Sequence, residues 1–96
     1  MNPVVLSLMA EADLETIADY IALDNPSRAL SFVKELRKIC LDLSLFPNAY
    51  SSFPELGENV RVMPYKNYMV LYHGLECSVS IERILHGARD IMNLTI

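Results

Sequence analysis

Hydrophobic residues recur along this chain with two different periods, and the change between them separates helices from strands. Residues 4–8 form a short apolar run that is β-branched at its start, which is typical of a strand. The apolar positions that follow at helical spacing are Leu14, Ile17, Ala18 and Ile21. Acidic residues lie off this stripe, so we expect an amphipathic helix after the first strand.

A second helical pattern begins at Asn25-Pro26, since Asn is a good N-cap and Pro is favoured at the first helical position. Its apolar positions, in steps of four and three, are Ala29, Val33, Leu36, Cys40 and Leu43. Pro47 predicts the end, so this helix is expected from about Pro26 to about Leu45. Two helices with so short a joint predict an αα-hairpin.

Strand patterns return after an irregular connection over residues 47–59. The expected strands are residues 60–63, 68–72 and 77–82, with turns at 64–67 and 73–76. At residues 83–85 the alternation breaks, which indicates either a bulge or a strand buried on both faces. Gly87 is expected to end the last strand, and residues 88–94 to form a short helical tail.

The order strand, helix, helix, strand, strand, strand predicts an α+β fold. We expect a helical hairpin packed on one face of a mainly antiparallel sheet of about four strands, followed by the short C-terminal tail. The 96 residues suit a single domain spanning 1–96.

Composition narrows the class of protein. The hydrophobic fraction of 52% is high for so short a chain and indicates a surface kept for a partner. No window has the roughly 18 unbroken apolar residues of a membrane span, and the N-terminus does not resemble a secretory signal, so we expect a cytoplasmic protein. Cys40 and Cys77 lack zinc spacing, so buried inert thiols, no metal and no cofactor are expected.

The net charge of −4 argues against broad binding to phosphate backbones, and we expect no sequence-specific DNA binding by this chain alone. The charge is uneven: residues 1–24 hold five acidic residues and no basic one. Any site that recognises an anion should therefore lie in the C-terminal half.

Four residues in that half are candidates for such a site: Arg61, Arg83, His86 and Arg89. Cleavage of RNA needs a base, an acid and cations around the phosphate, and these four are the plausible set if their strands are neighbours. Structural roles remain open for three of them: Arg61 as a cross-strand partner of Glu82, His86 as a donor to a backbone carbonyl, and Arg89 solvated or paired with Asp90.

Tyr65, Tyr68 and Tyr72 form a cluster that offers stacking for bases, although strand cores use Tyr equally well. Core packing is the favoured interpretation of the three. The exposed side of the helical hairpin is a candidate for holding a partner segment, by helix-in-groove docking or by strand addition.

The chain resembles the RelE/ParE toxin superfamily in several segments that occur in the right order. They are residues 12–21, the stretch Asn25-Pro26 with Ala29, Phe32 and Leu36, then Pro54-Glu55-Leu56, Val60-Arg61, Tyr68 and Tyr72, and finally residues 81–90. The resemblance implies a bacterial toxin of a type II toxin–antitoxin system, a role in plasmid stabilisation, a cognate antitoxin encoded beside it, and a toxin–antitoxin hetero-oligomer.

The resemblance leaves the target open, because the shared fold hosts different activities. ParE-type members poison DNA gyrase by binding, RelE-type members cut mRNA on the ribosome, and a degenerate member would bind its antitoxin without toxicity. No lysine lies between Leu56 and Met63, and no Tyr, His or basic residue follows Asp90. With the acidic net charge, these features favour a non-enzymatic gyrase inhibitor that contacts its target through Arg83, His86 and Arg89.

Overall fold

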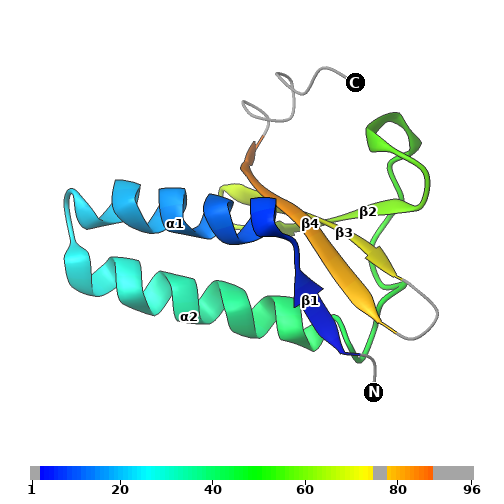
Figure 1. Ribbon diagram of the computed structural model, residues 1–96, viewed down its shortest axis with the longest axis horizontal. Helices are drawn as coiled ribbons and strands as arrows, with labels where there is room; N and C mark the ends of the chain where they lie inside the picture. Colours follow the sequence, from blue (N-terminus) through cyan, green and yellow to red (C-terminus); the bar gives the residue numbers. More distant parts are fainter. Residues whose placement is uncertain (1–2, 75–77, 88–96) are drawn as a thin grey trace.

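The computed structural model describes residues 3–74 and 78–87 of the chain. Its elements are β1 (Val4–Leu6), α1 (Leu8–Ala22), α2 (Pro26–Asp42), the 3-10 helix η1 (Pro54–Leu56), β2 (Val60–Tyr65), β3 (Tyr68–Gly74) and β4 (Val79–His86). The two helices lie side by side as a hairpin whose turn points away from the sheet (Figure 1). The predicted order of elements is confirmed; the tail expected at 88–94 and the thiol of Cys77 lie outside the described residues.

The four strands form one sheet in the order β1-β4-β3-β2. β2 pairs with β3, and β3 with β4, in antiparallel fashion, whereas β1 pairs with β4 in parallel. The predicted α+β fold with a mainly antiparallel sheet is therefore confirmed. A parallel pair needs a long crossover connection, which the helical hairpin and the β2–β3 hairpin supply between β1 and β4.

The helix ends follow from capping. Ser7 caps α1, its hydroxyl oxygen accepting the N–H of Ala10 at 3.0 Å, so β1 stops at Leu6, short of the predicted strand end. Asn25 caps α2 in the same way through the N–H of Arg28, as predicted. The regular part of α2 ends at Asp42 and not near Leu45, because residues 43–45 bond to carbonyls three residues back in a tightened turn.

The turn expected at residues 64–67 is shorter than predicted. β2 continues through Pro64 to Tyr65, and only Lys66 and Asn67 form the turn. Pro64 is tolerated because β2 is an edge strand. On its open side the N–H of Val62 bonds to the carbonyl of Ser51, and two residues further Pro64 occupies the equivalent outward position, where no sheet bond is lost.

Both interpretations of the broken alternation at residues 83–85 are confirmed. Leu71 pairs with Arg83 while Tyr72 pairs with Ile81, so Glu82 is the extra residue of a β-bulge. Beyond the bulge, β4 is buried on both faces. Ile84 packs in the core between sheet and helices, and Leu85 joins a smaller cluster with Val60, Val62 and Leu71.

The main core lies between the helical hairpin and the sheet. Its most enclosed side chains include Leu36, Cys40, Val70, Tyr72 and Ile81. Burial of these apolar side chains is the main force that holds the hairpin on the sheet. Cys40 is buried here as predicted, and burial raises the pKa of its thiol to about 11.

Candidate functional site

The three described basic candidates, Arg61, Arg83 and His86, do not form one cluster. Arg61 lies on β2 and Arg83 on β4, and β3 separates these strands. The expectation that their strands could be neighbours is therefore wrong. The cross-strand pair of Arg61 with Glu82 is wrong for the same reason: Arg61 donates instead to the carbonyl of Tyr50. Arg89 lies outside the described residues.

Arg83 is held by a carboxylate of the first helix. Its Nε and Nη2 donate to the two carboxylate oxygens of Asp13 at 2.8 and 3.0 Å. Both side chains are largely covered, with 28% of Arg83 and 16% of Asp13 exposed. Two-point bonds between a guanidinium and a carboxylate are short, strong and directional. The negative charge of Asp13 consequently neutralises the positive charge of Arg83, and the two bonds fix the direction of the Arg83 side chain.

The Asp13 carboxylate also binds a backbone group at the outer edge of β4. β1 covers only Val79, Ser80 and Ile81. Beyond it, the hydroxyl of Ser7 donates to the carbonyl of Glu82 at 2.7 Å, and Asp13 accepts the N–H of Ile84 at 2.9 Å. The start of α1 thus satisfies backbone groups that a longer β1 would have paired.

His86 ends β4 beside a row of aromatic rings. Its ring meets Tyr68 edge-on at 5.3 Å between centroids, and Tyr68 lies 5.5 Å from Phe32. Gly87 follows with a φ of +42°, and a Cβ there would lie 3.0 Å from the carbonyl oxygen of Asn67. Glycine is therefore the residue that can leave the strand here, as its predicted role at the strand end requires.

A polar cluster that the sequence did not reveal surrounds Glu35. Its carboxylate accepts hydrogen bonds from Arg28, from the hydroxyl of Tyr65 at 2.6 Å and from Lys66 at 3.3 Å. Arg28 first, then Tyr65 and Lys66, lower the pKa of Glu35 to about 2. Both cations also lie over the ring of Phe32. The cluster joins α2 to the β2–β3 turn, and Glu35 and Tyr65 are 30 residues apart in the sequence. No local sequence pattern could therefore predict it.

The three tyrosines contribute mainly to packing, as favoured from the sequence. Tyr72 is fully buried and its hydroxyl donates to the carbonyl of Pro47 at 2.9 Å, so it cannot stack on a base. Tyr65 is committed to Glu35, and Tyr68 packs between Phe32 and His86.

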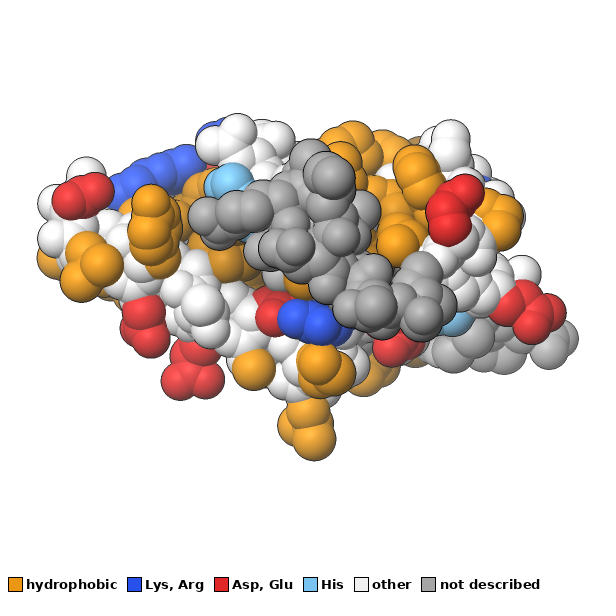
Figure 2. All heavy atoms as spheres, turned by 90° about the horizontal axis from the view of Figure 1, so that it is seen from above, with side chains coloured by type: hydrophobic (Ala, Val, Ile, Leu, Met, Phe, Trp, Pro, Cys, Tyr) orange, Lys and Arg blue, Asp and Glu red, His pale blue; other side chains and the backbone are white. Residues whose placement is uncertain are grey.

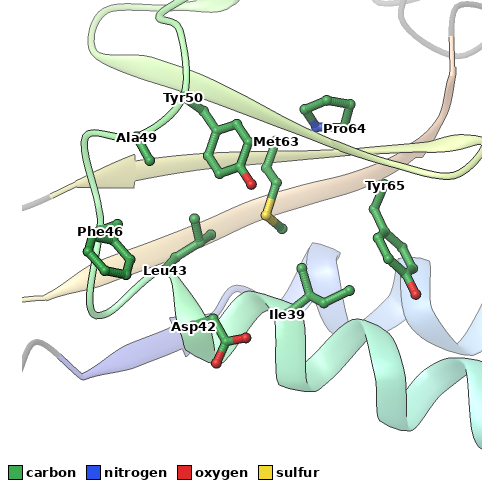
Figure 3. Close-up of a pocket in the computed structure, with 9 residues that line it drawn as sticks. All are labelled: Ile39, Asp42, Leu43, Phe46, Ala49, Tyr50, Met63, Pro64 and Tyr65. Atoms are coloured by element: carbon green, nitrogen blue, oxygen red, sulfur yellow. The ribbon is translucent and has the colours of Figure 1, made fainter.

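The surface has two hollows of interest. One, of about 360 Å³, lies between the end of α2, the loop after it and β2, where Met63 points toward Ile39 and Leu43 (Figure 3). Phe46, Tyr50 and Tyr65 also border it, and Asp42 is the charged residue of its lining. The other, of about 680 Å³, is a groove formed by residues of α1 and α2 alone.

The described part of the chain brings no three His, Cys, Asp or Glu side chains together as a group that could bind a metal ion. Over the same residues, neither α1 nor α2 has the combination of length and apolar composition needed to cross a membrane.

The helical hairpin packed on a mixed, mainly antiparallel four-stranded sheet is the α+β fold that the resemblance to the RelE/ParE superfamily implies. A sequence model described as "ParE toxin of type II toxin-antitoxin system, parDE" matches residues 4–91. The chain therefore belongs to the ParE toxin family of type II toxin–antitoxin systems.

Comparison with solved structures supports the fold. The chain is similar to one from a structure described as "Chromosomal ParDE TA system from P. aeruginosa", with a TM-score of 0.76 and 23% sequence identity. The match covers 91% of this chain and 97% of that one. No curated protein matches the sequence.

Proposed function

We propose that this ParE-type toxin inhibits DNA gyrase by direct protein–protein contact, and that a cognate antitoxin encoded beside it neutralises it by binding. One observation supports inhibition by binding over RNA cleavage: the basic candidates lie apart, because β3 separates Arg61 from Arg83 and His86. General acid–base cleavage of RNA needs its groups within hydrogen-bond reach of one phosphate.

The hydrogen bonds of Arg61 and Arg83, the two candidate arginines that the structure describes, support the same conclusion. Arg61 donates to the carbonyl of Tyr50, and Arg83 is bound at two points by Asp13. Side chains committed to the fold in this way are poor providers of free positive charge for a phosphate in its transition state. The net charge of −4 favours a protein target over the ribosome for the same electrostatic reason.

For target contact we propose the edge that carries Arg83, His86 and Arg89. Asp13 fixes the direction of Arg83, and a preorganised side chain loses less conformational entropy when it binds. The antitoxin would neutralise the toxin by covering this edge or by holding the tail elsewhere, in a toxin–antitoxin hetero-oligomer. The proposal places the protein in the bacterial cytoplasm, where it would act in plasmid stabilisation.

The test compares purified protein in two assays, gyrase supercoiling and cleavage of ribosome-bound mRNA. Three variants are informative: His86→Ala, the pair Arg83→Gln with Arg89→Gln, and the control pair Lys34→Gln with Lys38→Gln on α2. Gln at position 83 retains a donor for Asp13 and so protects the fold. Circular dichroism verifies folding of each variant.

We expect gyrase inhibition by the wild type, by His86→Ala and by the control pair, with intact mRNA throughout. The Arg83 and Arg89 pair should weaken inhibition in a graded way, as loss of a binding hot spot does. Loss of a catalytic acid or base would instead cost about 100- to 10,000-fold in rate. If the wild type cleaves ribosome-bound mRNA and His86→Ala abolishes cleavage while antitoxin binding survives, the nuclease function replaces the gyrase proposal.

A further inference from the structure

Two cations of the Glu35 cluster share a single carboxylate. Arg28 at the start of α2 and Lys66 in the β2–β3 turn both donate to Glu35, and their side chains are 37% and 51% exposed. Arg37, by contrast, has the carboxylate of Glu11 as its own partner. Among the described residues, no second carboxylate forms an ion pair with either cation of the cluster. The cluster therefore carries a surplus positive charge in an acidic protein.

Lys66 occupies a backbone position that does not favour lysine. Tyr65 pairs with Tyr68, so Lys66 and Asn67 are the two central residues of the hairpin turn, and the φ of Lys66 is +54°. Glycine is usual at a first central position with positive φ, because a side chain there crowds its own backbone. Residues held in such conformations gather at functional sites, so Lys66 points to a role beyond forming the turn.

Aromatic rings connect the two cations with the edge proposed for target contact. Arg28 and Lys66 lie 5.1 and 5.9 Å from the ring centre of Phe32, and Tyr68 lies 5.5 Å from the same ring. Tyr68 in turn meets His86 at 5.3 Å. At the upper left, Figure 2 shows Lys and Arg side chains gathered on this face, in the region of one of the histidines. The cations therefore extend the proposed edge from His86 onto the helical hairpin.

We propose that Arg28 and Lys66 form a second contact with gyrase, in which they bind carboxylates on the surface of that protein. Glu35 and Phe32 hold both cations in place, so little side-chain entropy is lost on binding. Carboxylates suit two positioned cationic donors, because the bonds between them are short and charge-assisted. The closely spaced phosphates of DNA suit the protein less, since its net charge is −4. The inference rests on gyrase as the target.

The test measures association of the purified toxin with immobilised gyrase at low and high salt. Lys66→Gln and Lys34→Gln remove the same charge, and Lys34 is an exposed residue of α2 that has no ion pair with another described residue. At low salt we expect Lys66→Gln to slow association by about threefold or more, and Lys34→Gln by less than about 1.5-fold. Adding Arg28→Gln to Lys66→Gln should slow it further. The differences should shrink as salt rises, because exposed charges are screened.

Lys66→Gly separates binding from stability. Glycine accepts the positive φ at position 66 without strain, and the exposed bond from Lys66 to Glu35 contributes little to folding. We therefore expect Lys66→Gly to unfold at a temperature no lower than that of the wild type, yet to associate with gyrase as slowly as Lys66→Gln. Association at the wild-type rate would show that the lysine serves no contact.

The outcomes distinguish this inference from the proposed function. Equal association rates of Lys66→Gln and Lys34→Gln would overturn the second contact while leaving gyrase as the target. Absence of any complex between wild type and gyrase would instead overturn the gyrase proposal itself. Binding of the wild type to duplex DNA without gyrase, lost in Lys66→Gln, would replace carboxylates with phosphates as the ligand of the two cations.

Discussion

Asp13 of α1 and Arg83 of β4, 70 residues apart in the sequence, form a two-point ion pair that also binds the backbone of the last strand. The carboxylate accepts both guanidinium bonds and the N–H of Ile84. One side chain of the first helix therefore fixes both the direction of a proposed target-binding residue and the open edge of its strand.

Replacing Asp13 should be costly for the fold. Asp13→Ala leaves a partly buried cation and a strand N–H without their acceptor, and we expect a loss of about 2–3 kcal/mol in the free energy of unfolding. Urea denaturation measures it. Asp19→Ala, at an exposed position of the same helix, should change stability by no more than about 0.5 kcal/mol. Equal losses in the two variants would contradict the role given to Asp13.

Glu35 should contribute to the pH dependence of stability. Its pKa in the folded protein is about 2, lowered from 4.5 chiefly by Arg28. Because the folded pKa lies below the unfolded value, the contribution is complete above about pH 4.5 and is lost as pH falls toward 2. Thermal unfolding of Glu35→Gln between pH 2 and 6 should show a shallower acid decline than the wild type. Glu55→Gln, at an exposed position, should retain the wild-type slope.

Variants of Tyr72 can distinguish a structural role of this side chain from a role in toxicity. Tyr72→Phe removes the bond to the carbonyl of Pro47 and should cost about 1 kcal/mol of stability. Tyr72→Ala also leaves a cavity in the core and should cost about 3–5 kcal/mol. Chemical denaturation gives both values. Toxicity should persist in Tyr72→Phe as long as the protein remains folded, and a loss without destabilisation would assign the hydroxyl a functional role.

Cys40 should be inert in the native protein. It is fully buried and its thiol pKa of about 11 leaves very little thiolate at neutral pH. In a Cys77→Ser background, an aromatic disulfide reagent at pH 7.5 should label Cys40 only after denaturant is added. Labelling of the native protein at the rate of the unfolded chain would show that this part of the core opens readily.

Local patterns determined most of the elements of this protein. The apolar stripe of residues 14–21 and the cap at Asn25-Pro26 predicted two helices, and the alternating segments predicted three of the four strands close to their observed places. These predictions succeeded because helix spacing, capping and strand alternation depend on residues within a few positions of one another. The break of alternation at 83–85 even located the bulge.

Pairings between distant segments were decided only by the tertiary structure. Nothing near Arg61 shows that β3 would lie between it and Arg83, because strand order depends on how the whole sheet assembles. The carboxylates of Asp13 and Glu35 find their partners across 70 and 30 residues, after the helices have packed on the sheet. The groove likewise exists only once α1 and α2 lie together, since each helix supplies one wall. Periodicity therefore determined the elements, and packing determined which charges and surfaces they bring together.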